Sequence, residues 1–219
     1  MRFMKIYYLP NISNEWNLQD KTLLNYVSVQ RQKKIAKFHT ALDKKLSLYA
    51  SLLVRMEISL ATGASVSNLQ FSLDSNNKPI LVSYPNINFN FSHTHNAILC
   101  GIACNNSIGV DIEKINTPPL TIMNKVFHPQ EIEYVSQKDI IQKQIRFYEI
   151  WTRKEAFAKQ LGIGLTTQIN KYNTIGEPIS SLLNTWQIDE YCCSVSCEKQ
   201  CLYTMHTINE KSIYEFYFS

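Results

Sequence analysis

Residues 107–114 read SIGVDIEK, an alternation of apolar and polar side chains that predicts a β-strand. On such a strand Asp111 and Glu113 share one face, with Cα atoms roughly 6.5–7 Å apart. Val110 and Ile112 point the other way, into a core. Two adjacent carboxylates are unfavourable without a cation between them, and Mg²⁺ prefers oxygen ligands. The alternative is an edge strand with a solvated acidic face, and the segment alone favours that alternative.

The chain on either side of this strand follows one order twice, a long helix and then strands. The first helix is predicted to be capped by Asp43 and to end at Gly63, and the second spans 139–161 and ends at Gly162. Strands are predicted at 5–9, 69–73, 87–92, 97–104, 107–115, 168–174, 185–197, 202–208 and 213–218. This pattern predicts an α+β fold of two similar halves that meet near residue 105.

Composition narrows the class of protein. The 219 residues are 45% hydrophobic, enough for a real core, which excludes wholesale disorder. A net charge of +4 weakly favours anionic ligands, but no basic stripe indicates a nucleic-acid partner. The longest apolar run, 97–104, is far too short for a membrane span, and the N-terminus does not resemble a signal peptide. We therefore expect a cytoplasmic protein with no membrane partner.

Six cysteines invite a zinc or disulfide interpretation. Cys193, Cys197 and Cys201 lack the paired spacing that tetrahedral zinc prefers. We expect reduced structural thiols instead.

Three further segments carry polar groups with two interpretations each. On the second long helix Tyr148, Thr152, Glu155 and Lys159 share a face, so that Glu155 and Lys159 form either a surface ion pair or part of a site. Residues 88–95 end a strand with Ser92, His93 and His95, which are either structural or ligands of a metal or anion. The basic run on the first-half helices, Arg31, Lys33, Lys34, Lys37, Lys44 and Lys45, is typical of a solvated face.

Taken together, three motifs resemble a known family. They are Phe-x-Phe-Ser-His at 89–93, Gly-Val-Asp-x-Glu at 109–113 and Trp-Thr-x-Lys-Glu-Ala-x-x-Lys at 151–159. Their order and spacing resemble the 4′-phosphopantetheinyl transferase superfamily, in particular its Sfp type and the W/KEA branch of that type. The resemblance extends from Met4 to about Leu165.

The resemblance implies a pseudo-dimeric α+β fold, with a long helix packed on an antiparallel sheet in each half. Residues 1–105 would form the half that binds the nucleotide of coenzyme A, and 106–219 the magnesium-binding and catalytic half. The implied reaction transfers the phosphopantetheine arm of coenzyme A, the substrate, to a serine of an apo acyl or peptidyl carrier protein and releases adenosine 3′,5′-bisphosphate. The cofactor would be Mg²⁺, which the sequence does not distinguish from Mn²⁺, and the protein a monomer.

The resemblance also implies roles for single residues. Asp111, Glu113 and Glu155 would hold the metal, with Glu155 as the base for the carrier serine. Lys159 would contact the pyrophosphate. The remaining coenzyme A contacts would come from Ser92, His93, Arg31, Lys34, Ser47 and Lys78.

Some positions depart from the family pattern. Asn77 stands where a glycine often precedes Lys78, which leaves the shape of that loop open. Glu131 either reaches the metal or supports the fold, and His95 has no counterpart, so that we expect it to be structural. Two other functions use the same residues: a noncatalytic module that binds coenzyme A or a carrier protein, and a Mg²⁺-dependent pyrophosphatase. The retention of Asp111, Glu113, Glu155 and Lys159 disfavours the module.

Overall fold

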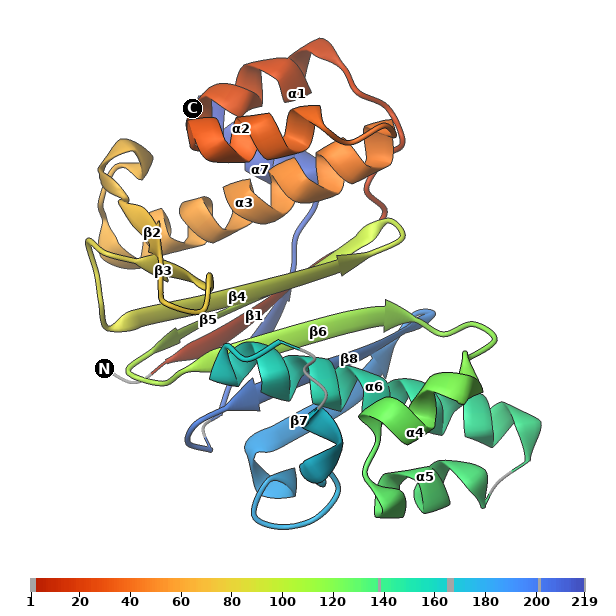
Figure 1. Ribbon diagram of the computed structural model, residues 1–219. Coiled ribbons are helices and arrows are strands. Elements are labelled where there is room, and N and C mark those ends of the chain that lie inside the picture. The colour runs from red at the N-terminus through yellow and green to blue at the C-terminus, as the bar shows by residue number, and fades with distance from the viewer. Residues whose placement is uncertain (1–2, 138, 165–167, 201, 219) are drawn as a thin grey trace.

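Two β-sheets lie face to face between two layers of helices in the computed structural model (Figure 1). The structure describes residues 3–137, 139–164, 168–200 and 202–218, so that Leu165 and Cys201 lie outside it. The first sheet has the order β4-β5-β1-β9, with β1 Met4–Leu9, β4 Ile87–Thr94, β5 Ala97–Cys104 and β9 Thr204–Thr207. The second has the order β6-β8-β7, with β6 Ile108–Lys114, β7 Leu183–Ile188 and β8 Tyr191–Cys197. A separate hairpin joins β2 Phe71–Leu73 to β3 Pro79–Leu81.

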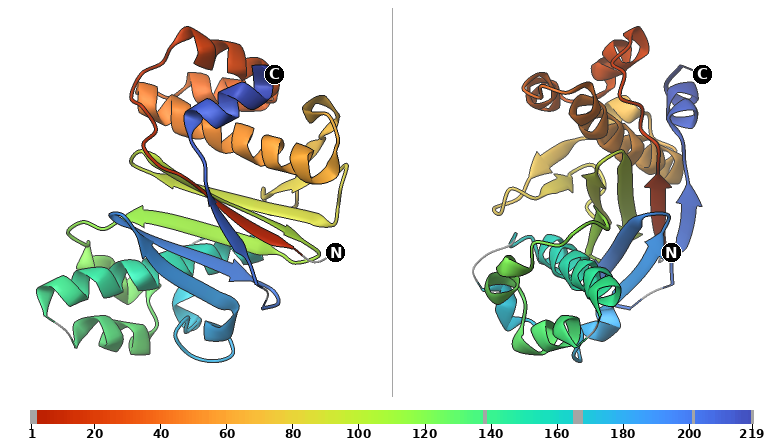
Figure 2. Two further views of the ribbon diagram at one scale, coloured as in Figure 1. Left: turned by 180° about the vertical axis from the view of Figure 1, so that it is seen from behind. Right: turned by 90° about the vertical axis from the view of Figure 1, so that its right-hand side faces the viewer.

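Helices cover the outer face of each sheet, as both views in Figure 2 show. Those over the first sheet are α1 Leu18–Leu23, α2 Val29–Ala36, α3 Ala41–Thr62 and α7 Glu210–Phe218. Those over the second are α4 Met123–Val126, α5 Pro129–Ser136 and α6 Ile140–Leu161. Short 3₁₀ helices lie at Leu24–Tyr26, Val66–Asn68, Leu120–Ile122, Ile169–Lys171 and Ser180–Leu182.

Strand alternation divides the apolar side chains between the cores. In β6, Val110 and Ile112 are fully buried in the core between the sheets, as their spacing predicts. Asp111 and Glu113 consequently lie on the other face of β6, against which α6 packs. The predicted strands at 5–9, 87–92, 97–104 and 107–115 are confirmed, and the two long helices are present.

Gly109 lets α6 lie directly on β6. A Cβ atom at this position would stand 2.0 Å from the carbonyl oxygen of Ala156 and 2.4 Å from the nitrogen of Gln160, both in α6. Any larger residue would push the helix away from the strand. The glycine of the Gly-Val-Asp-x-Glu motif therefore brings the last turns of α6 beside Asp111.

The residues that cap the two long helices are those predicted, except for the N-cap of α3. α6 begins after Asp139, which accepts a hydrogen bond from the nitrogen of Gln142, and ends at Gly162 in the left-handed conformation. α3 ends at Gly63 as predicted, but its N-cap is Thr40. Asp43 lies within the first turn, where its nitrogen donates to the Thr40 hydroxyl and its carboxylate accepts from it.

Other corrections concern the C-terminal third. Residues 168–174 hold a 3₁₀ helix, not a strand, and two of their carbonyls accept hydrogen bonds from Lys154. The predicted strand at 185–197 is a hairpin of two strands, β7 and β8, with Asp189 in the left-handed conformation at its turn. β9 is parallel to β1, so that the first sheet is not wholly antiparallel.

The segment 213–218 is helix α7 instead of a strand. Its aromatic residues favour a strand by propensity, but Ile213 and Tyr217 are four residues apart and both are buried in the core of the first half. Lys45, assigned to a solvated basic face, is in fact fully buried. Its Nζ lies 2.6 Å from a Glu210 carboxylate oxygen, and this ion pair ties α7 to α3.

Candidate active site

The two sheets meet at an edge where β4, β6 and α6 bring polar side chains together. Asp111 on β6 is buried, and its Oδ1 accepts hydrogen bonds from Lys159 Nζ at 2.6 Å and Ser92 Oγ at 2.8 Å. Lys159 Nζ also donates to Ser92 Oγ at 3.0 Å, which closes a triangle of α6, β4 and β6. Asp111 Oδ2 is buried and accepts no hydrogen bond from the described residues. An unpartnered carboxylate oxygen is costly to bury, so it marks a place for a ligand.

Two further carboxylates lie beside Asp111. Burial and the Asp111 charge raise the pKa of Glu113 from 4.5 to about 7, although Thr94 Oγ1 donates to its Oε2 at 3.0 Å. Burial and Asp111 also raise the pKa of Glu155, whose carboxylate makes no hydrogen bond or ion pair within the described ranges. The Asp111 charge acts on both glutamates, so the three predicted metal ligands Asp111, Glu113 and Glu155 lie close enough together to interact electrostatically.

The carboxylate cluster has oxygen donors that suit a hard cation, but its side chains are not arranged in a complete coordination site. No three histidine, cysteine or acidic side chains of the described chain are close enough together to hold a metal as they stand. Lys159 now supplies the positive charge at Asp111. The free Oδ2 of Asp111 and the uncommitted Glu155 carboxylate are oxygen donors of the kind that Mg²⁺ takes. The residues therefore fit a divalent cation.

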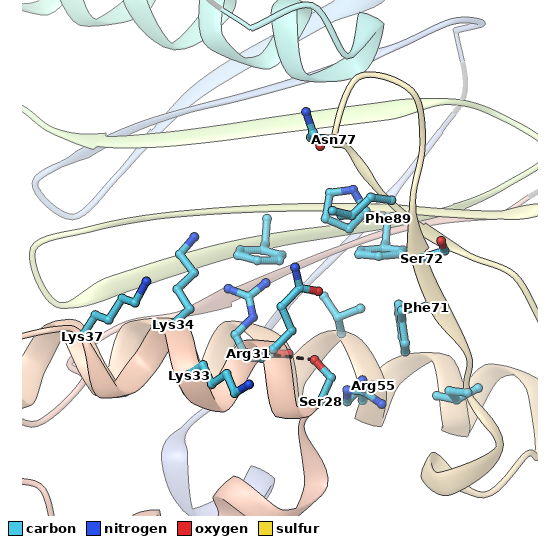
Figure 3. A pocket seen from close by; sticks show the side chains of 17 residues that line it. Ser28, Arg31, Lys33, Lys34, Lys37, Arg55, Phe71, Ser72, Asn77 and Phe89 are labelled. Atoms are coloured by element: carbon cyan, nitrogen blue, oxygen red, sulfur yellow. Dashed lines mark hydrogen bonds between the residues drawn. The ribbon is translucent and has the colours of Figure 1, made fainter.

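A cavity of about 980 Å³ opens between α2, α3, β4 and the β2–β3 hairpin (Figure 3). Its cationic lining residues are Arg31, Lys33, Lys34, Lys37 and Arg55, and its aromatic ones are Phe71, Phe89 and Phe91. The guanidinium carbon of Arg55 lies 4.4 Å from the centre of the Phe71 ring. Five cations without a facing carboxylate in the lining make this a cavity for a polyanion with apolar or aromatic parts.

The predicted nucleotide-binding residues divide into two groups. Arg31 and Lys34 line the cavity, and the pKa of Lys34 is lowered by burial and by the Arg31 charge. Ser47 is buried behind them, 3.4 Å from Arg31 Nη1, so that it supports the arginine. Lys78 lies outside the lining, where its Nζ donates to the carbonyl of Gln160 at 3.0 Å and to that of Ile108 at 3.4 Å.

Ser92 and His93 are neighbours on β4 and consequently point to opposite faces. Ser92 is turned toward Asp111, whereas the His93 ring is exposed. The surrounding protein and the charges of Lys159 and Lys34 lower the pKa of His93. Asn77 lines the cavity with φ of 61°, a left-handed conformation that asparagine tolerates better than most residues and that explains why it can replace a glycine.

Sequence analysis missed two polar residues of the site. Arg55 follows Ser47 and Ser51 at steps of four along α3, a spacing that could have placed it on the same face. Thr94 follows Ser92 at a step of two along β4, which puts it on the face turned toward β6.

Glu131 lies away from the cluster and supports the fold. Its carboxylate is fully buried and pairs with Lys154 Nζ at 2.8 Å. It also accepts from the nitrogen of His128 at 2.7 Å and from the nitrogen and hydroxyl of Thr174 at 2.7 and 2.6 Å. This carboxylate has no capacity left for a metal ion.

Comparison with known proteins agrees with this geometry. Residues 107–207 match the model of the 4′-phosphopantetheinyl transferase superfamily, and 14–106 match that of the 4′-phosphopantetheinyl transferase N-terminal region. The 4′-phosphopantetheinyl transferase ffp of Bacillus subtilis is 30% identical over 173 residues, which are 79% of this chain and 75% of the relative. The chain belongs to the 4′-phosphopantetheinyl transferase superfamily.

Other relatives extend the family match. The transferase Sfp of Bacillus subtilis (strain 168) is 29% identical over 79% of this chain and 75% of its own length. The rat L-aminoadipate-semialdehyde dehydrogenase-phosphopantetheinyl transferase is 25% identical over 79% of this chain and 59% of its own length. In the described part of the chain, no helix combines the length and the apolar character needed to cross a membrane.

Proposed function

We propose that this chain transfers the 4′-phosphopantetheine group of coenzyme A to a serine of an apo acyl or peptidyl carrier protein and releases adenosine 3′,5′-bisphosphate. The family match supports the transfer. The observation that carries the proposal is Asp111, a buried carboxylate held by Lys159 and Ser92, with one oxygen left without a partner in the described chain.

In this proposal Asp111, Glu113 and Glu155 hold Mg²⁺, with Mn²⁺ as the alternative. Bound there, the ion would supply neutralisation of the pyrophosphate charge. Glu155 accepts the proton of the carrier serine, because its carboxylate is uncommitted and burial raises its pKa, which makes it a stronger base than an ordinary glutamate. The serine oxygen bonds to the phosphorus that carries pantetheine while the bond from this phosphorus to the bridging oxygen breaks. The electron pair leaves with adenosine 3′,5′-bisphosphate.

The other residues bind and orient coenzyme A. Lys159 contacts the pyrophosphate from the edge of the carboxylate cluster, and Ser92 and His93 contact phosphate groups from opposite faces of β4. The basic and aromatic cavity takes the nucleotide through Arg31 and Lys34, with Ser47 behind the arginine and Lys78 in the turn of the β2–β3 hairpin. This assignment is supported by the match between five cations and a ligand with several phosphate charges.

Nucleotide binding and catalysis are assigned to different halves of the molecule. We propose residues 1–105 as the nucleotide-binding half and 106–219 as the metal-binding and catalytic half, except that β9 and α7 of the second stretch pack on the first half. One chain carries both, so a monomer suffices. Cys100, Cys104, Cys192 and Cys193 are buried free thiols, which supports a reducing cytoplasmic location.

Intact-mass spectrometry of an apo carrier protein, incubated with this protein, coenzyme A and Mg²⁺, tests the function. We expect the carrier to gain one phosphopantetheine group, and EDTA or the Asp111→Asn variant to abolish the gain. Lys114→Met is the matched control, because Lys114 follows Glu113 on β6 but points to the opposite face of the strand, where it pairs with Glu190 at 2.8 Å. No gain with several carriers, while coenzyme A still raises the melting temperature, would establish the binding module instead. Cleavage of coenzyme A without a carrier would establish the pyrophosphatase.

A further inference from the structure

Strand β4 holds β6 through alternate side chains, although the two strands belong to different sheets. Asn90 Oδ1 accepts from the nitrogen of Val110 at 2.9 Å, and Ser92 Oγ donates to Asp111 at 2.8 Å. Thr94 Oγ1 donates to Glu113 at 3.0 Å. The first half of the molecule therefore fixes the backbone and both carboxylates of the strand that carries the cluster.

Thr94 is the last of these contacts and has a second partner. When it binds a cation, the Glu113 carboxylate is ionised and offers only lone pairs, so the single hydroxyl proton of Thr94 goes to Glu113. The Thr94 oxygen is then free to accept, and His95 Nδ1 lies 3.3 Å from it. In the tautomer with its proton on Nδ1, the His95 ring donates to this oxygen and so fixes the direction in which the threonine donates.

The backbone of His95 supports this arrangement. Its φ of 46° is left-handed, which is unfavourable for a residue with a β-carbon, and it lies in the short connection between β4 and β5. In this turn the histidine ring is brought beside its own neighbour, Thr94. Neither residue belongs to the motifs that define the family resemblance.

We propose that Thr94 positions the Glu113 carboxylate for the divalent cation and that His95 orients the Thr94 hydroxyl. The inference rests on the proposed function, since it assumes that Glu113 is a metal ligand. Both are positioning residues, because neither touches coenzyme A or the carrier serine. Hydrogen-bond partners of metal ligands typically change metal affinity by about 10- to 100-fold when they are removed.

Titration with Mn²⁺, followed by the electron paramagnetic resonance signal of the free ion, measures this directly in the presence of coenzyme A and without carrier protein. We expect Thr94→Val to weaken Mn²⁺ binding by about 10-fold or more, and Thr94→Ser, which keeps the hydroxyl, to stay within about 2-fold of the unmodified protein. His95→Gly keeps the left-handed turn and removes the ring, with an expected loss of about 3-fold.

Thr207→Val is the matched control, because β9 is the opposite edge of the same sheet and its Thr207 is exposed. Should Thr94→Val not fold, Thr94→Ala removes the same hydroxyl. Unchanged Mn²⁺ affinity in the valine or alanine variant would overturn the role of Thr94, as would equal weakening in the serine variant. Unchanged affinity in His95→Gly would overturn the role of His95.

The control experiment separates this inference from the function on which it rests. If the unmodified protein binds Mn²⁺, Asp111→Asn abolishes the binding and Thr94→Val does not alter it, only the positioning role fails. If the unmodified protein binds no Mn²⁺ at all, the metal assignment fails and the positioning role fails with it.

Discussion

Helix α6 carries two lysine–carboxylate pairs that differ in how completely they are satisfied. Lys154 and Glu131 are both 0% exposed and 2.8 Å apart, and the surrounding backbone and Thr174 use their remaining hydrogen-bonding groups. Lys159 and Asp111 are 2.6 Å apart, but the lysine is 28% exposed and one oxygen of the aspartate has no partner in the described chain.

The difference separates a structural pair from a functional one. A buried pair with every lone pair engaged contributes to one defined packing and leaves nothing for a ligand. A pair with an unpartnered oxygen and a solvent-accessible lysine can exchange partners. The family resemblance assigns Lys159 to the pyrophosphate and gives Lys154 no role, and the structure shows Lys154 in a buried ion pair with Glu131.

The largest expected effect comes from breaking the structural pair. Lys154→Met leaves the Glu131 carboxylate buried and unpaired, which should lower the free energy of unfolding by about 3–5 kcal/mol. Urea denaturation measures this. Lys114→Met, which breaks a half-exposed pair, should cost less than about 1 kcal/mol. Adding Glu131→Gln to Lys154→Met should restore part of the loss. If Lys154→Met and Lys114→Met were equally stable, the Lys154–Glu131 pair would contribute no more to stability than an exposed pair.

Next comes the aspartate of the functional pair. Asp111→Asn should reduce transfer to the carrier by about 100-fold or more, since it removes a proposed ligand. Its free energy of unfolding should stay within about 1 kcal/mol of the unmodified protein, because the burial cost of the charge disappears with the charge. Single-turnover transfer assays and urea curves on one preparation check both. A variant that folds and still transfers at the unmodified rate would refute the metal assignment.

Lys159→Ala should act on the rate less strongly. A hydrogen bond from a charged donor to the pyrophosphate contributes about 1.5–3 kcal/mol, or roughly 10- to 100-fold in rate. Stability should fall less than for Lys154→Met, because Lys159 is partly solvated. Steady-state kinetics with coenzyme A as the varied substrate is the measurement. An unchanged rate would reduce Lys159 to a surface ion pair.

The smallest effect concerns pH. In metal-free protein the pKa of Glu113 is raised to about 7, so between 4.5 and 7 the folded state holds a proton that the unfolded chain has released. Stability is therefore greatest below this window and falls as the pH rises through it. In EDTA the melting temperature should fall more steeply between pH 5 and pH 7.5 in the unmodified protein than in Glu113→Gln. Parallel curves would show that Glu113 does not titrate there.

Much of the site was predictable because strand and helix periodicity act locally. Alternation in β6 separates Asp111 from Val110, and the spacing of Glu155 and Lys159 places both on one side of α6. The family motif adds their identity as a set. Local patterns also predict both long helices and the strands that form the two cores.

The rest depends on contacts between segments distant in sequence. Glu131 forms its ion pair with Lys154 only when α5 packs on α6. Thr94 forms its hydrogen bond with Glu113 only when the two sheets pack together. The aromatic residues of α7 favour a strand by propensity. The segment is a helix because Ile213 and Tyr217, four residues apart, both pack into the core of the first half. Residues 168–174 hold a 3₁₀ helix whose Ile169 and Tyr172 carbonyls accept hydrogen bonds from Lys154, a contact that the local sequence does not reveal.

The return of the C-terminal segment to the first half has a consequence for synthesis. Ile213 and Tyr217 lie in the core of the first half, and Tyr217 Oη donates to the carbonyl of Leu52 at 2.9 Å. β9 likewise extends the sheet that begins with β1. On the ribosome, where domains generally fold from the N-terminus onward, the core and the sheet of the first half stay incomplete until residues 204–218, which follow the whole second half, have been made.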